Sequence, residues 1–325
     1  MSASFGNPVV LAPGSDNRLL LAASTGGHLA QLVRLAPGLG ANDESVWVTF
    51  RSPQSESLLG GRRVLFVPYI GPRDARSIAR AFAEIRVRIR GDRFDAAVST
   101  GSGIALAALP AAHLAGMKTV YIESFSRVEA PSLSGRILAG ARFTEMRTQH
   151  PGWANGRWSL HGSVLDTYRS EPRPVDGSRP LRIFVTLGTI QGYEFRSLVD
   201  RVLELGLAND ETVWQLGSTR ANTALPGTVR SQVSASEFEA RARNADVVIT
   251  HAGVGTLISL FEMGVYPLAV VRRKARGEHV DDHQAQIAKL VDELGIASTS
   301  EVEDLDGALV AATARRRINV DLVAR

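Results

Sequence analysis

The sequence lacks cysteine entirely and contains very little lysine. The absence of cysteine excludes disulfides, thiolate zinc sites, iron–sulfur clusters and cysteine nucleophiles. Lysine occurs only at Lys118, Lys274 and Lys289, so nearly all of the 37 basic residues are arginine. The chain also has no apolar run of the roughly 20 residues that a membrane-spanning helix needs, and its first residues do not have the pattern of a secretory signal. We therefore expect a cytoplasmic protein whose membrane contact is at most peripheral.

The composition is that of a soluble globular protein of about two domains, with 325 residues, 44% hydrophobic and 22% charged. The formal net charge of +4 is compatible with nucleic acid, an anionic membrane surface or an anionic substrate as partner, or with codon usage alone. Aromatic residues make up only 6%, and no basic stripe with interleaved aromatics is present. This pattern argues against a nucleic-acid binder.

Short apolar runs alternate with helical stretches along the whole chain, which predicts parallel sheets covered on both faces. The expected strands are 18–23, 45–50, 63–68, 94–99, 118–123, 181–186, 212–216, 246–250 and 267–271, and the expected helices include 74–90, 193–205, 236–243, 255–263 and 281–294. A proline-rich segment at 169–180 has the composition of a linker. We predict an α/β protein with two doubly wound Rossmann-like domains, 1–170 and 171–325, facing a cleft, with ligands beyond the carboxyl ends of the strands.

A glycine pair follows the first expected strand, in the sequence Ser24-Thr25-Gly26-Gly27-His28. A strand, a glycine turn and a helix start place free backbone N–H groups at a helix N-terminus, which is a site for anions. A tight turn with no ligand gives the same pattern. The imidazole of His28 would lie at this edge of the sheet, where it serves either as a general base or as a packing residue.

Another polar segment, ESFSRV, follows the strand at 118–123. The carboxylate of Glu123 lies beside the hydroxyl of Ser124 and the guanidinium of Arg127, so these residues either line a ligand site or pair to order a loop. Arg127 suits a diphosphate.

In the second half, a strand leads into His251-Ala252-Gly253-Val254-Gly255-Thr256 and then a helix. We expect the helix to start at Gly255 and Thr256, with Thr256 at or near its N-cap. Backbone N–H groups, a hydroxyl and an imidazole would then converge on one point, which suits a diphosphate.

The next strand is followed by four cations in five residues, 272–276, and then by Asp282, His283 and Gln284 at a helix start. The charge run is typical of a solvated loop. Carboxylate, imidazole and amide groups together suit a hydroxyl-rich ligand such as a sugar. They are contiguous, whereas chelating residues on a helix are usually three or four apart, so we expect no metal site here.

These motifs resemble a family of glycosyltransferases. STGGHLAQL at 24–32, TGSG at 100–103 and ESFSRVEAPSLSG at 123–135 are similar to the acceptor-binding subunit of the two-subunit N-acetylglucosaminyltransferase that extends dolichyl-diphosphate-linked sugar, and to bacterial exopolysaccharide transferase subunits. VTLGT at 185–189, WQLGS at 214–218, HAGVGT at 251–256 and GEHVDDHQ at 277–284 are similar to the catalytic donor-binding subunit. Both halves lie here on one chain, as in the related lipid-intermediate transferase of peptidoglycan synthesis.

The resemblance implies a GT-B fold and an inverting transfer, without metal or cofactor, from a UDP-sugar to a polyprenyl-diphosphate-linked sugar at the cytoplasmic membrane face. On the acceptor side, the resemblance implies binding or catalytic roles for Gly26, Gly27, His28, Glu123, Ser124 and Arg127. On the donor side it carries over to Gly188, Thr189, His251, Gly253, Gly255, Thr256 and Gln284, with Asp282 and His283 beside it. We take His28 as the first candidate for the catalytic base and Glu123 as the second.

One position departs from the family pattern. Many relatives have a ribose-binding glutamate where this chain has Ser259, and Glu262, one helical turn further on, is the expected substitute.

Residues 74–90 combine Ile78, Phe82, Ile85 and Ile89 at helical spacing with five flanking arginines. Such a helix either lies on an anionic membrane surface or packs against the core.

Two rival functions remain open from the sequence. A UDP-sugar 2-epimerase uses the same fold and a similar diphosphate loop but has no need of the ESFSRV segment. A noncatalytic protein that binds a nucleotide sugar or nucleic acid is the other.

Overall fold

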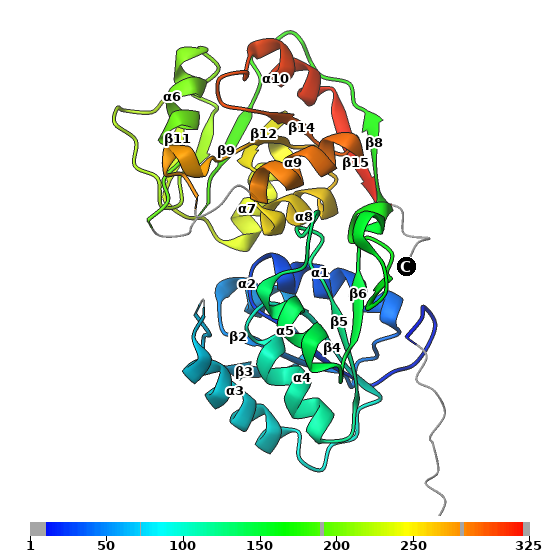
Figure 1. Ribbon diagram of the computed structural model, residues 1–325. Helices are drawn as coiled ribbons and strands as arrows, with labels where there is room; N and C mark the ends of the chain where they lie inside the picture. Colours follow the sequence, from blue (N-terminus) through cyan, green and yellow to red (C-terminus); the bar gives the residue numbers. More distant parts are fainter. Residues whose placement is uncertain (1–10, 72, 189–191, 280–282, 321–325) are drawn as a thin grey trace, which may run out of the picture. The chain divides into compact units, whose positions relative to one another are not determined.

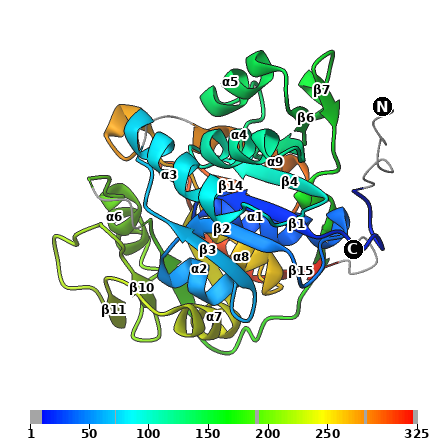
Figure 2. The same ribbon diagram turned by 90° about the horizontal axis from the view of Figure 1, so that it is seen from below.

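The computed structural model describes residues 11–71, 73–188, 192–279 and 283–320. These residues form two compact units, of which one ends at Val164 and the other begins at Leu165. Each unit is built around a parallel sheet with helices on both faces, as Figures 1 and 2 show.

In the first unit, the described strands lie in the order β3-β2-β1-β4-β5-β6-β7, and all neighbours are parallel. The elements are β1 (Leu19–Ala23), α1 (Gly27–Leu35), β2 (Val46–Phe50), α2 (Pro53–Leu58), β3 (Arg63–Val67), α3 (Ala75–Arg88), β4 (Ala96–Gly101), α4 (Ala105–Leu114), β5 (Lys118–Ile122), α5 (Leu133–Ala141), β6 (Glu145–Thr148) and β7 (Trp158–Leu160).

The first strand is buried along its whole length, which explains its unbroken apolar sequence. Leu20 and Ala22 point into a core that includes residues of α3, α4 and α5, whereas α1 and α2 lie on the other face of the sheet (Figure 2).

The second unit repeats this design, with its main sheet in the order β11-β10-β9-β12-β13-β14. Its elements are β8 (Tyr168–Pro172), β9 (Ile183–Thr186), α6 (Arg196–Glu204), β10 (Val213–Gln215), β11 (Thr228–Arg230), α7 (Ala235–Asn244), β12 (Val247–His251), α8 (Val254–Glu262), β13 (Leu268–Val270), α9 (His283–Glu293), β14 (Ser298–Ser300), α10 (Gly307–Ala314) and β15 (Arg316–Val320).

The two faces of this second sheet carry different side chains because residues alternate along a strand. Ile183 and Val185 of β9 pack against residues of α6 and α10. Phe184, between them, packs on the opposite side against α7 and α8.

Both sheets reverse their strand order at a single point, and each reversal coincides with a glycine loop of the sequence. In the first unit it lies between β1 and β4, which end at Ala23 and Gly101. In the second it lies between β9 and β12, which end at Thr186 and His251. Ligands of doubly wound sheets bind at this point, beyond the carboxyl ends of the strands.

The segment that we predicted to be a linker, 169–180, is partly strand. Residues 168–172 form β8, which pairs with β15 in antiparallel register. Further along, Arg173, Arg179 and Arg182 all contact the carboxylate of Asp246, which is 6% exposed. The proline-rich stretch is therefore anchored to the second unit, and the boundary between the units lies at 164/165 rather than at 170/171.

The structure decides between the two interpretations of the basic amphipathic segment. Ile85 and Ile89 are buried in the core of the first unit, and Ile78 and Phe82 pack against it. The apolar face of α3 is therefore not available to enter a bilayer, although Arg76 and Arg80 on its other face are exposed.

Among the described helices, none has both the length and the apolar character needed to cross a membrane.

Candidate functional site

The first glycine loop places His28 at the switch point of the first unit. Helix α1 begins at Gly27, with Gly26 as its N-cap at φ +88°, a conformation that glycine adopts without strain. The N–H of Gly26 donates to Oε1 of Gln54 (2.5 Å), and Nε2 of Gln54 donates back to its carbonyl oxygen (3.2 Å). We predicted that Gly26 offers its N–H to an anion, but Gln54 takes that donor. The N–H groups of Gly27 and His28 remain in the first turn, where a helix has no internal partner.

The ring of His28 is fixed by the end of the neighbouring strand. Its Nδ1 lies 2.6 Å from the carbonyl oxygen of Thr100, and the hydroxyl of Thr100 donates to the carbonyl of His28 (2.8 Å). Because a carbonyl only accepts, Nδ1 carries the proton and Nε2 carries the lone pair. Burial lowers the pKa of His28 to about 4; the Thr100 carbonyl opposes this shift and the charge of Arg127 adds to it. The side chain is therefore a neutral base at physiological pH.

Glu123, the second candidate base, is completely buried directly after β5. Its carboxylate accepts from the backbone N–H and hydroxyl of Ser132 (2.8 and 2.9 Å), the N–H of Ser124 (3.1 Å) and the hydroxyl of Tyr121 (3.0 Å). Ser132 is in turn the N-cap of α5. Burial raises the pKa of Glu123, and these donors oppose the rise. The surroundings favour a role in holding the segment 123–135 over a role as base.

Ser124 is held by a buried glutamine that the sequence analysis did not single out. Gln31 of α1 donates from Nε2 to the Ser124 hydroxyl (2.8 Å) and accepts the N–H of Phe125 at Oε1 (3.0 Å). Gln149, also buried, donates to the carbonyl of Glu123 (2.9 Å). The N–H of Arg127 donates to the carbonyl of Ser124 (2.9 Å), which closes a turn. Buried amides thus connect the His28 helix to the ESFSRV segment.

In the second unit, helix α8 begins at Val254, one residue earlier than we predicted. Gly253 is its N-cap, and Val254, Gly255 and Thr256 form its first turn, so Thr256 is not the cap. A methyl group at Gly253 would lie 2.2 Å from Nε2 of His251, so only glycine fits there. The N–H groups of this first turn have no partner within the helix, so the geometry is compatible with the anion site that we predicted, which stays a prediction.

His251 is 8% exposed and remains neutral. Burial is the main reason that its pKa falls to about 3, and the positive charge of Arg272 lowers it further.

Arg272 lies at the same edge of the sheet and was not among our candidates. It follows β13, is 1% exposed, and donates from Nε to Oε1 of Gln284 (3.2 Å). A methyl group at Gly188 would lie 2.9 Å from Nη1 of Arg272, so the guanidinium lies directly against the first donor-side turn. Its neighbour Arg273 instead pairs with Glu301 (2.5 Å) at half-exposed positions. Only part of the charge run is therefore a solvated loop.

Three residues that we predicted for the donor side are not described by the structure, or are described only in part. Thr189 and Asp282 are not among the described residues, and for His283 only the backbone, at the start of α9, is described.

Glu262, which we expected to replace the ribose-binding glutamate of the family, lies at the far end of α8. Oε1 of Glu262 accepts from the hydroxyl of Tyr168 (2.6 Å), and the helix ends at this residue. Ser259 donates to the carbonyl of Gly255 within the helix (2.9 Å).

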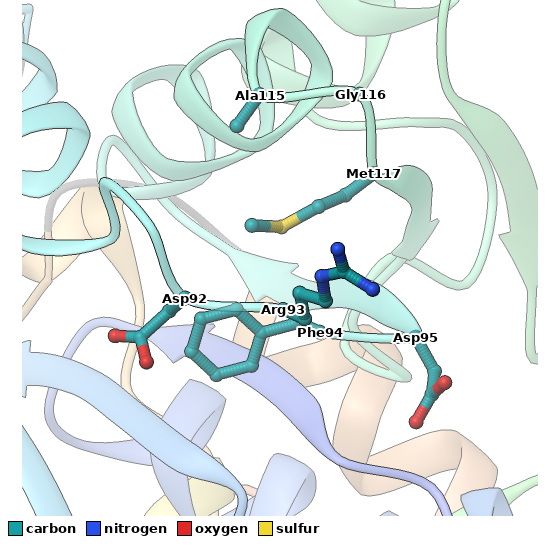
Figure 3. A pocket seen from close by; sticks show the side chains of 7 residues that line it. All are labelled: Asp92, Arg93, Phe94, Asp95, Ala115, Gly116 and Met117. Atoms are coloured by element: carbon teal, nitrogen blue, oxygen red, sulfur yellow. The ribbon is translucent and has the colours of Figure 1, made fainter.

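A cavity of about 360 Å³ lies elsewhere in the first unit. Figure 3 shows its lining, which includes Asp92, Phe94 and Asp95 before β4 and Gly116 and Met117 before β5. These residues are at the amino ends of the strands, so the cavity is separate from the glycine-loop edge. Within the part of the chain that the structure describes, no group of three or more acidic or histidine side chains is arranged to hold a metal ion.

Comparison with known proteins bears on the fold and on the class of enzyme. Residues 182–317 match the model of the glycosyltransferase family 28 C-terminal domain. A relative from Parasynechococcus marenigrum (strain WH8102), described as a UDP-N-acetylglucosamine–N-acetylmuramyl-(pentapeptide) pyrophosphoryl-undecaprenol N-acetylglucosamine transferase, is 27% identical over 298 residues, covering 84% of this chain and 81% of the relative.

Solved structures share the fold. MurG of Acinetobacter baumannii aligns with a TM-score of 0.53 and 18% identity over 91% of this chain and 89% of its own. The glycosyltransferase SnogD from Streptomyces nogalater aligns with a TM-score of 0.55 and 18% identity over 93% and 92%. A putative UDP-N-acetylglucosamine 2-epimerase from Listeria monocytogenes also aligns, with a TM-score of 0.51 and 13% identity over 86% and 88%.

The GT-B fold is thereby confirmed, with two Rossmann-like halves. The family match and the relatives together indicate a glycosyltransferase. The closer likeness to a two-subunit enzyme remains a prediction.

Proposed function

We propose that the protein transfers a sugar from a UDP-sugar to a polyprenyl-diphosphate-linked saccharide in the synthesis of an exopolysaccharide or another cell-envelope glycan. The observation that carries the proposal is the state of His28, a neutral imidazole whose Nε2 lone pair lies at the switch point of the first sheet. The activity by which the relative is described, transfer of N-acetylglucosamine to a pyrophosphoryl-undecaprenol acceptor, supports the class of acceptor.

The chemistry is a direct displacement that inverts the anomeric carbon. Nε2 of His28 takes the proton of the acceptor hydroxyl as its oxygen attacks that carbon. The bond from the carbon to the diphosphate oxygen breaks, and its electron pair leaves with UDP. The bond from Nδ1 to the Thr100 carbonyl stabilises the imidazolium that forms, because a carbonyl oxygen accepts more strongly from a charged donor.

On the donor side, the first turn of α8 receives the diphosphate. The N–H groups of Val254, Gly255 and Thr256 point beyond the helix, where its dipole favours negative charge. Negative charge grows on UDP during the transfer, so these fixed donors stabilise the transition state more than the ground state. We propose that the reaction needs no divalent metal for this reason.

On the acceptor side, the N–H groups of Gly27 and His28, the hydroxyl of Ser124 and the guanidinium of Arg127 are the proposed contacts of the lipid diphosphate. Gln31 supports this assignment, because it fixes the Ser124 hydroxyl from within the core.

For membrane contact we propose the exposed face of α5 rather than the apolar face of α3. Leu133 and Ile137 are 60% and 50% exposed, and Arg136 between them is also exposed. Helix α3, whose arginines face solvent, lies in the same helical layer (Figure 2). Apolar side chains beside basic ones suit the anionic cytoplasmic leaflet. Replacing both Leu133 and Ile137 by serine should reduce sedimentation with anionic vesicles; unchanged sedimentation would refute this surface.

The epimerase on the same fold is the alternative. It acts on the UDP-sugar alone, so incubation without a lipid acceptor distinguishes the two. We expect no interconversion of the sugar by proton NMR in that mixture.

The stereochemistry and the metal requirement are tested on the isolated product. We expect a linkage opposite in anomeric configuration to the donor, formed at the same rate in EDTA. A retained configuration, or activity that returns only with a divalent metal, would contradict the mechanism.

A further inference from the structure

Arg272 is an almost fully buried cation that forms no ion pair with an acidic side chain among the residues that the structure describes. Its exposed fraction is 1%, and its single hydrogen bond within the described residues runs from Nε to Gln284. Nη1 and Nη2, which carry four N–H donors, have no hydrogen-bond or ion-pair partner among those residues. A buried charge without a partner is costly, and proteins retain one where a ligand supplies the counter-charge.

Within the described part of the chain, the acidic group whose charge influences Arg272 is already engaged. Glu278 raises the pKa of Arg272 from a distance, but its carboxylate accepts from Nε of Arg276 (2.9 Å), from the N–H of Arg273 (3.0 Å) and from the hydroxyl of Ser197. Burial outweighs its influence and lowers the pKa of Arg272 to about 10, so the guanidinium is still charged at neutral pH.

The position of Arg272 places it among the donor-side elements. It follows β13, whose Val270 is paired with His251 at the end of β12, two residues before the N-cap of α8. Its guanidinium lies against Gly188 at the end of β9, and its charge lowers the pKa of His251. Three adjacent strands of the second sheet thus bring the α8 N-terminus, the glycine turn and a buried guanidinium to one edge.

We propose that Arg272 is a ligand-binding residue whose Nη1 and Nη2 groups contact the diphosphate of the nucleotide-sugar donor. This inference rests on the proposed function and adds a fixed positive charge to the helix N-terminus. A guanidinium binds a diphosphate through two parallel donors and keeps its charge as UDP leaves. The bond from Nε to Gln284 also connects the diphosphate contact to the residue proposed to bind the sugar.

The binding experiment compares a nucleoside diphosphate with its own nucleoside by calorimetry. UDP, GDP and dTDP are titrated into the wild-type protein. The diphosphate that binds is then compared with its own nucleoside, which is uridine, guanosine or thymidine respectively. In R272Q, we expect the diphosphate to bind about ten- to a hundredfold more weakly, and the nucleoside to bind as in the wild type. R273Q is the matched control, because Arg273 pairs with Glu301, and should bind both as the wild type does.

R272K is the second variant, in case R272Q does not fold. It keeps the charge but not the two-point contact, so diphosphate affinity should fall several-fold with nucleoside affinity unchanged. If both variants bind the diphosphate as tightly as the wild type, or lose diphosphate and nucleoside affinity equally, the inference is overturned. If the wild type binds no nucleoside diphosphate, the proposed function fails first, and this inference with it.

Discussion

The imidazole of His28 donates from Nδ1 to the carbonyl oxygen of Thr100, 2.6 Å away, and the Thr100 hydroxyl donates back to the carbonyl of His28. This reciprocal contact joins the first turn of α1 to the end of β4 at the switch point of the sheet. It fixes both the orientation and the tautomer of the ring, so that Nε2 is the basic nitrogen.

Replacing His28 should therefore remove the base without removing the donor site. We expect H28A to lower kcat by about 10²- to 10⁴-fold while the affinity for UDP stays that of the wild type. H113A is a suitable control, since His113 is exposed and stacks on Phe143. Near-full turnover by H28A would show that another group takes the proton.

The pH dependence of the rate should reflect the lowered pKa of His28. Protonation of Nε2 abolishes the base, so kcat/KM should fall on the acid side with a midpoint near pH 4 rather than 6.5. In the pH profile of kcat, the midpoint of the acid limb should lie at a higher pH, because a bound acceptor diphosphate stabilises the imidazolium. R127Q should raise the kcat/KM midpoint, since the Arg127 charge lowers the pKa of His28. A kcat/KM midpoint at 6.5 in the wild type would contradict the burial of the ring.

Glu123 should affect stability more than proton transfer. In E123Q, an amide NH₂ would face the N–H of Ser132 or that of Ser124, which leaves a buried donor without an acceptor. We expect the free energy of unfolding to fall by about 1–3 kcal/mol. The pH midpoint of kcat/KM should stay where it is. A variant of wild-type stability with no measurable turnover would instead indicate that Glu123 is the base.

Asp246 should be the main anchor of the proline-rich segment. Its carboxylate accepts from Arg179 (2.6 Å) and from the N–H of Arg182 (2.9 Å), and these contacts hold the pKa of Asp246 well below its usual range. In urea denaturation at pH 7, D246N should lose about 2–4 kcal/mol. A lowered pKa stabilises the fold above the unfolded pKa near 3.8, so the difference between D246N and wild type should shrink as the pH falls below 4. D304N, at an exposed position, should match the wild type at both pH values.

The parts of the fold that the sequence predicts well are those with strong local signals. The strands that end at Ala23 and His251 begin with apolar runs, and glycine follows each strand within three residues, so both the burial and the turn are local consequences of that sequence. The strands that we missed, such as β7 and β15, are short or largely exposed. Their pairing depends on partners far along the chain, as β15 depends on β8.

The residues of the candidate site also divide into those that a local sequence pattern predicts and those that only tertiary packing defines. Glycine spacing predicts where anions bind, but it does not distinguish Arg272 from Arg273, because adjacent arginines have equal local propensity. Only the packing of Gly188 and Gln284 against the guanidinium separates the buried cation from its surface neighbour. The burial of Glu123 by Ser132 and Tyr121 is likewise a tertiary property that a sequence pattern does not contain.

In the proposed reaction, a lipid-linked saccharide accepts a sugar from a UDP-sugar. The most direct test is to measure UDP release by the purified protein from a panel of UDP-sugars in EDTA, with and without a polyprenyl-diphosphate-linked saccharide extract. We expect UDP release that requires the extract, is confined to one donor and is lost in H28A. Release that is independent of the extract, or no release beside interconversion of the UDP-sugar itself, would contradict it.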